Sequence, residues 1–243
     1  MRIKNKKEIF NELTKNYIEL LDKSLVSIYV YGSSITPDFD PQTSDINVSL
    51  IVKDLKLDNI IPSKKLINKF KKKGVSTPLF LSEEYINRSL DSYPIEFLDI
   101  KSNNKLLYGK DIFSGIFLDP KHLRLQAERE LKGKLLLLRL AFLENIQKKK
   151  YILPVIKKSI KSIIPILKSI LKISHNEIPL TSAEIIEDIQ IKLNINTYSL
   201  TRAWNFTRKK KIKLSNEDLV QFFQEYIAEV DKLSNFVDKL KVN

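Results

Sequence analysis

Two short apolar segments joined by a turn-rich loop constrain the fold of this chain more than any other part of its 243 residues. Residues 25–31 (Leu-Val-Ser-Ile-Tyr-Val-Tyr) and 46–52 (Ile-Asn-Val-Ser-Leu-Ile-Val) are rich in β-branched and aromatic residues, which favours strands. The first segment runs into Gly32-Ser33, and Asp45-Ile46-Asn47 opens the second. Because glycine lets the backbone turn sharply, the pattern predicts a strand, a tight turn, and a second strand with polar residues at its start.

The polar residues in this pattern suggest phosphate and metal chemistry. Asp45 and Asn47 are two residues apart on an expected strand, so their side chains point to the same side of the sheet. Two carboxylates in that arrangement can hold a pair of Mg²⁺ ions, which activate an attacking hydroxyl and neutralise a triphosphate. Here the second position carries an amide, which can ligate Mg²⁺ but has no charge. We expect Gly32, Ser33 and Ser34 to bind phosphate through the turn and its hydroxyl groups.

A third carboxylate on a neighbouring strand usually completes such a site, and we assign this role to Glu96. Residues 94–100 (Pro-Ile-Glu-Phe-Leu-Asp-Ile) are expected to form that strand. Asp99 and Glu83 are alternatives, because the register of the strands is open. The predicted catalytic and metal-ligating residues are therefore Asp45, Asn47 and Glu96.

The rest of the chain is expected to be mostly helical. Apolar residues recur at helical spacing in 5–23, 59–73 and 83–90, with a further short strand at 77–81. From about residue 121 the pattern indicates only helices, at 121–147, 151–173, 182–193, 199–211 and 215–240. The change of composition near 115–121 predicts two domains, 1–118 and 119–243. We therefore predict an α+β fold, with a mixed sheet and flanking helices followed by an all-α helical bundle.

The positive charge of the chain permits two explanations. The net charge is +13, and only seven of the 42 basic residues are Arg. Residues 148–175 contain eight Lys and no acid, and Arg208-Lys209-Lys210-Lys211 forms a second cluster. A solvated outer face of the helices and a surface for nucleic acid or a phosphorylated partner both agree with this pattern. We keep nucleic acid as a partner that the charge permits but does not favour.

The composition also excludes several classes of protein. The chain has no cysteine, which excludes disulfides, thiolate zinc sites and a cysteine nucleophile. Lysines interrupt the most apolar long segment, 151–173, so that no membrane span is expected. The basic start of the chain leads into an amphipathic pattern rather than the apolar core of a signal peptide. We therefore expect a cytoplasmic protein without a membrane partner.

Residues of about 20–115 resemble the nucleotidyltransferase domain of the DNA polymerase beta superfamily, as found in aminoglycoside nucleotidyltransferases and related small bacterial proteins. In that family a Gly-Ser strand end precedes Ser-Asp-x-Asp and a later carboxylate strand, and the matching residues here are Gly32-Ser33, Ser44-Asp45 and Glu96. Leu107-Tyr108-Gly109 and residues 122–131 are similar to relatives that continue into a helical C-terminal domain. The resemblance implies Mg²⁺-dependent transfer of a nucleoside monophosphate from ATP or another nucleoside triphosphate to a hydroxyl acceptor.

Asn47 departs from the family pattern, and three functions therefore stay open. The first is metal-dependent nucleotidyl transfer, in which Asp38 or Asp40 could supply the missing carboxylate. The second is a catalytically degenerate module that binds a nucleotide or a protein. The third is a basic protein that binds nucleic acid through its lysine-rich helices.

Overall fold

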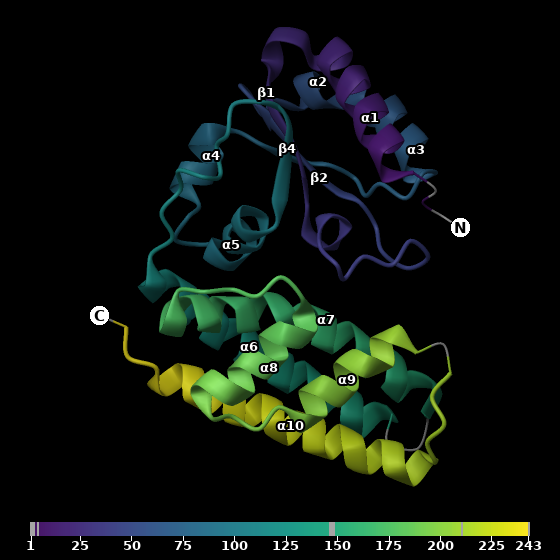
Figure 1. The fold of residues 1–243 in the computed structure, drawn as a ribbon, viewed down its shortest axis with the longest axis vertical. Helices are drawn as coiled ribbons and strands as arrows, with labels where there is room; N and C mark the ends of the chain where they lie inside the picture. Colours follow the sequence, from purple (N-terminus) through teal and green to yellow (C-terminus); the bar gives the residue numbers. More distant parts are fainter. Residues whose placement is uncertain (1–2, 4, 146–148, 210, 243) are drawn as a thin grey trace. The chain divides into compact units, whose positions relative to one another are not determined.

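The structure is a computed structural model that describes residues 3, 5–145, 149–209 and 211–242. Contacts divide the chain into two compact units, shown in Figure 1. Unit 1 comprises Met1–Tyr93 and Phe97–Leu118, and unit 2 comprises Pro94–Glu96 and Asp119–Asn243. Each unit is described separately.

A four-stranded mixed sheet forms the centre of unit 1. Its strand order is β3-β2-β1-β4, with β1 at Leu25–Tyr31, β2 at Asn47–Val52, β3 at Leu79–Leu81 and β4 at Asn104–Gly109. Strand β1 is antiparallel to both β2 and β4, whereas β2 and β3 are parallel. The register places Tyr31 between Asn47 on β2 and Asn104 on β4. The end of β1, which leads into Gly32, is therefore held on both sides.

Helices cover both faces of this sheet (Figure 1). On one face lie α1 (Lys6–Leu21) and α3 (Lys64–Lys71), where Tyr17 and Phe70 pack against the apolar side of β1 and β2. On the other lie α4 (Glu83–Arg88), α5 (Pro94–Ser102) and the segment after β4, which contribute Ile86, Phe97 and Phe113. The short helices α2 (Leu57–Ile60), η1 (Asp22–Ser24), η2 (Gly32–Ile35) and η3 (Ile61–Ser63) connect these elements.

The strand predicted at 94–100 is wrong, because this segment is the helix α5. The fourth strand is instead β4, which follows directly after it. Pro94 stands in the first turn of α5, where its restricted φ and missing N–H suit a helix. The exposed Glu96 and half-buried Asp99 are three residues apart between buried apolar residues, which is helical spacing. Because most of this segment is buried, its apolar residues do not distinguish a strand from a helix.

Unit 2 is built from long helices. They are α6 (Pro120–Asn145), α7 (Lys149–His175), α8 (Ser182–Leu193), α9 (Tyr198–Arg208) and α10 (Asn216–Lys239). Helix α7 contributes the fully buried Ile156 and Ile160, and α10 contributes Phe223 and Tyr226. None of the helices in the described ranges combines the length and hydrophobicity needed to cross a membrane.

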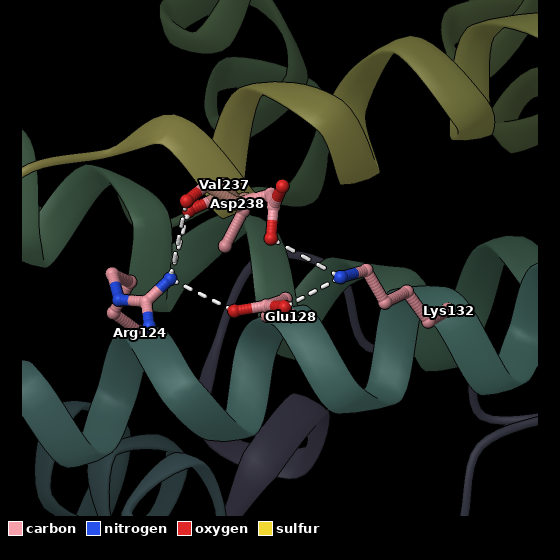
Figure 2. Close-up of polar contacts among 5 residues, drawn as sticks. All are labelled: Arg124, Glu128, Lys132, Val237 and Asp238. Carbon is pink, nitrogen blue, oxygen red and sulfur yellow. Dashed lines mark hydrogen bonds and ion pairs between the residues drawn. The ribbon is translucent and has the colours of Figure 1, made fainter.

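Polar contacts join α6 to the end of α10 (Figure 2). Glu128 accepts hydrogen bonds from Arg124 at 2.8 Å and from Lys132 at 2.5 Å. Arg124 also donates to the carbonyl of Val237 at 3.3 Å, and Lys132 donates to Asp238 at 3.1 Å. A positive charge on α6 thus meets the carbonyl groups at the C-terminus of α10, where the helix dipole favours it.

Candidate functional site

The turn after β1 is the first part of the candidate site. Gly32 begins η2 with φ of +73°, in the left-handed region that favours glycine. Its N–H donates to the carbonyl of Asn103 at 2.9 Å. A Cβ atom on Gly32 would lie only 3.1 Å from Nδ2 of Asn47. The turn and the Asn47 amide, predicted as parts of one site, are therefore in close contact.

The two serines of the turn differ in their surroundings. Ser34 is 1% exposed, and its hydroxyl donates to the carbonyl of Tyr31 at 3.2 Å. Ser33 is half-buried, and its carbonyl accepts the N–H of Thr36 at 3.2 Å. Ser34 thus stabilises the turn from inside, whereas Ser33 is closer to solvent. Direct contacts of both residues with phosphate stay predictions.

Lys6 contacts the turn, and the sequence did not predict this contact. Its ammonium group, at the start of α1, donates to the carbonyl of Ser34 at 2.8 Å. The same group lies 4.2 Å from the centre of the Phe39 ring, a favourable cation–π contact. Lys6 therefore brings a positive charge to the turn, but nothing in the sequence separates it from the many other lysines.

Asn47 is oriented by a second neighbour, Ser76. The Asn47 side chain is half-buried, and its Oδ1 accepts a hydrogen bond from the Ser76 hydroxyl at 3.1 Å. The Ser76 hydroxyl also lies 3.2 Å from the carbonyl of Ile46, so its single proton has two acceptors. The amide oxygen of Asn47 thus faces Ser76, and the amide nitrogen faces Gly32. Asp45, two residues earlier, is exposed.

Asp40 organises the loop that carries Asp45. Its two carboxylate oxygens accept the N–H of Gln42 at 2.9 Å and the hydroxyl of Thr43 at 2.8 Å. Its carbonyl accepts the N–H of Ser44 at 2.8 Å. Both carboxylate oxygens are used within the loop, so the structure gives no support to Asp40 as a substitute for the carboxylate missing at Asn47.

Asp99 lies near the same end of the sheet. Tyr31, the cross-strand partner of Asn47, has a raised pKa, because burial disfavours the phenolate and the negative charge of Asp99 disfavours it further. Asp99, which sequence reasoning kept as an alternative third acid, therefore acts electrostatically on the residue beside Asn47. Unit 1 brings Asp99 to this position through α5.

Glu96, the assigned third carboxylate, is exposed in the first turn of α5 and groups with unit 2. Its Oε2 accepts a hydrogen bond from Nε2 of Gln126 at 2.8 Å, and the same nitrogen donates to Glu130 at 2.8 Å. Oε1 of Gln126 accepts the N–H of Ile95 at 2.9 Å, and Gln126 is only 4% exposed. A buried glutamine therefore orients Glu96. Its role in catalysis stays a prediction.

The residues of the candidate site in unit 1 suit a Mg²⁺ ion only if the ion is bound together with a triphosphate. Among the described residues, no three or more His, Cys, Asp or Glu side chains come close enough together to hold a metal ion. Mg²⁺ commonly binds one or two carboxylates together with substrate phosphates and water. Asp45 and Asn47 offer oxygen atoms of the kind that Mg²⁺ takes, and a triphosphate and water would have to supply the remaining ligands. They do not form a complete metal site by themselves.

Comparisons with known proteins identify the fold. By sequence, the chain matches no protein-family model and no curated protein. By structure, it is similar to spectinomycin adenyltransferase AAD(9) from Enterococcus faecialis, solved with ATP and spectinomycin. The TM-score is 0.60 at 14% identity, and the match covers 93% of this chain and 100% of that one. The predicted α+β fold is thereby confirmed: the chain has the nucleotidyltransferase fold, and helices follow its sheet in the chain.

Proposed function

We propose that the chain binds a nucleoside triphosphate with Mg²⁺ at the Gly32 turn and transfers a nucleoside monophosphate to a hydroxyl acceptor. The position of the Asn47 amide nitrogen, 3.1 Å from where a Cβ atom of Gly32 would lie, carries this proposal, because it brings a hydrogen-bond donor to the turn. The similar fold of AAD(9), which was solved with ATP, supports it.

The proposal gives each residue of the site a role. Ser33 and the backbone after Gly32 would donate hydrogen bonds to phosphate, and Lys6 would add positive charge. Asp45 would hold Mg²⁺ together with phosphate oxygens, and Asn47 would contact phosphate through Nδ2 or Mg²⁺ through Oδ1. Mg²⁺ would supply neutralisation of the phosphate charge and acidification of the acceptor hydroxyl.

The second candidate is a degenerate nucleotidyltransferase that binds nucleotide without transferring it. The hydrogen bond from Ser76 to Oδ1 of Asn47 favours this candidate, because it engages the atom that would otherwise ligate a metal. The amide also leaves position 47 without the negative charge that a two-metal site uses.

Calorimetric titration of the full chain with ATP tests the binding that both candidates share. We expect binding that requires Mg²⁺ and weakens at least tenfold in Asp45→Asn. The matched control is Asp58→Asn, which removes the same charge from an exposed residue of unit 1. Absence of binding at millimolar ATP, or equal effects of the two substitutions, would refute the proposal.

Release of pyrophosphate in the presence of hydroxyl acceptors, beginning with spectinomycin, separates the two candidates. Release by the natural chain that is lost in Asp45→Asn indicates transfer. Binding without release, together with release created by Asn47→Asp, indicates the degenerate module. Glu96→Gln tests the third acid in the same assay: loss of release with unchanged ATP affinity is expected.

A further inference from the structure

Two segments of unit 2 are strongly basic and contain no acid. Residues 148–175 contain eight Lys, and residues 201–213 contain six Lys and Arg, with no Asp or Glu in either segment. The second segment covers most of α9 and the chain that follows it. A high net charge spread over a whole surface does not indicate where a polyanion binds, whereas cations gathered on one face do indicate a binding surface.

The fold brings these two segments together. The ammonium group of Lys157, on α7, donates to the carbonyl of Lys209, at the end of α9, at 3.3 Å. Lys150, Lys157 and Lys161 share one face of α7, because they are seven and four residues apart. We define the basic surface as Lys150, Lys157, Lys158 and Lys161 of α7 with Arg208, Lys209 and Lys211.

Three lysines of the basic surface, Lys158, Lys161 and Lys211, form no ion pair within the part of the chain that the structure describes. All members of the basic surface are exposed except Lys157, which is half-buried. An anionic partner could therefore approach these three lysines without displacing an acidic side chain. A polyanion would gain most, since each contact releases counterions.

Aromatic side chains accompany the cations. The guanidinium of Arg208 lies 5.0 Å from the centre of the Trp204 ring, one helical turn earlier. Tyr151, beside Lys150, is 48% exposed. Proteins that bind single-stranded nucleic acid typically combine lysines that contact the phosphates with aromatic rings that stack on the bases. A membrane surface fits less well, because the apolar face of α7 is already buried in unit 2.

We propose that the basic surface binds single-stranded nucleic acid, with its lysines on phosphates and with Trp204 and Tyr151 near the bases. Lysine is a point charge without the forked geometry of arginine, so the contacts would be largely independent of base sequence. This inference is independent of the nucleotide site in unit 1.

The test is a titration of the full chain with a labelled single-stranded RNA of mixed sequence, followed by fluorescence anisotropy at several salt concentrations. Each lost phosphate contact should reduce the slope of log K against log salt by about 0.7. The combined variant Lys158→Gln, Lys161→Gln and Lys211→Gln should therefore reduce the slope by about 2 and weaken binding at least tenfold.

The matched control is Lys64→Gln, Lys65→Gln and Lys72→Gln, which removes the same charge from exposed lysines of unit 1. Its affinity and slope should remain those of the natural chain. An equal loss in both variants would overturn the proposal, because it would show that net charge alone drives binding. Absence of RNA binding even at low salt would also overturn it.

The single tryptophan gives a second readout, since Trp204 is the only one in the chain. Stacking near a base should change its fluorescence when RNA binds, whereas inorganic polyphosphate has no bases and should leave it nearly unchanged. The proposal would be overturned if the fluorescence did not change when RNA binds and if polyphosphate or phosphatidylserine vesicles bound as tightly as RNA. The partner of the basic surface would then be anions in general or a lipid surface.

Discussion

Replacing Gly32 by alanine tests whether the turn after β1 and the Asn47 amide act as one structural unit. Gly32 has φ of +73°, which costs a residue with a Cβ atom roughly 1–2 kcal/mol. The new Cβ would also lie 3.1 Å from Nδ2 of Asn47, so the amide must move by a few tenths of an ångström. We expect a loss of about 1–2 kcal/mol in stability, which lowers the Tm of unit 1 by roughly 4–8 °C.

Gly32→Ala should weaken ATP binding as well. The displaced Asn47 amide would donate less well to phosphate, and a hydrogen bond to a charged group contributes about 1.5–3 kcal/mol when it is fully formed. Because a shift of a few tenths of an ångström loses only part of this energy, the affinity should fall about threefold to tenfold. Calorimetric titration with ATP and Mg²⁺, at a temperature where circular dichroism shows the variant to be folded, separates this effect from the loss of stability.

Gly115→Ala is the matched control for this prediction. Gly115 is in the same unit, its φ is not positive, and a Cβ there would meet no atom within 4 Å. Its ATP affinity should equal that of the natural chain, and its Tm should be equal or slightly higher, because alanine restricts the unfolded chain more than glycine does. An unchanged Tm in Gly32→Ala would refute the account of the turn. A lower Tm with unchanged ATP affinity would refute the proposed contact between Asn47 and phosphate.

Three further predictions concern unit 2. Gly133→Ala should raise its stability by about 1 kcal/mol in thermal unfolding, because Gly133 lies inside α6 with open space around it; an equal or lower Tm would contradict this. Burial raises the pKa of Glu229, so its contribution to stability is present below the unfolded-state pKa and is lost as pH rises through the folded value. Glu229→Gln should remove this decline of Tm with rising pH. If the decline persists in the variant, another group causes it. Glu128→Gln should lower stability by about 1 kcal/mol, less at high salt, because it weakens the bonds to Arg124 and Lys132; a loss independent of salt would exclude this cause.

The strands that hold the candidate site were predictable from sequence. Residues 25–31 coincide with β1, and 46–52 differ from β2 by one residue. Both segments are mostly apolar and rich in β-branched and aromatic residues, and most of their residues are buried in the sheet. The glycine that ends the first run has the positive φ that its position implied.

The error at α5 and β4 has a physical cause. Helix α5 buries apolar residues on most of its surface, so its hydrophobic pattern does not distinguish a helix from a strand. Strand β4 (Asn-Lys-Leu-Leu-Tyr-Gly) is only partly buried along its length, so it lacks a strong apolar signal. Its place beside β1 is set by pairing across the sheet, which periodicity within one segment does not contain.

The supporting residues of the site were not predictable, because they come from distant parts of the chain. Ser76 reaches Asn47 across 29 positions, and Lys6 reaches Ser34 across 28. Gln126 reaches Glu96 across 30. Serine, lysine and glutamine at these positions match no motif by themselves. Their effect appears only when strand pairing and helix packing have brought the segments together.

The orientation of the Asn47 amide indicates what an asparagine does at a position where the resembled family has an aspartate. An aspartate with the same orientation would direct a carboxylate oxygen at the Gly32 turn, where phosphate is proposed to bind. Two such charges at about 4 Å repel by about 4 kcal/mol at an effective dielectric constant near 20, unless a metal ion lies between them. In the proposed site the amide nitrogen would instead donate a hydrogen bond to phosphate and would need no second metal. Under this proposal Asn47 would favour the binding of phosphate with a single Mg²⁺ ion, and it would weaken the activation of a hydroxyl by two metal ions.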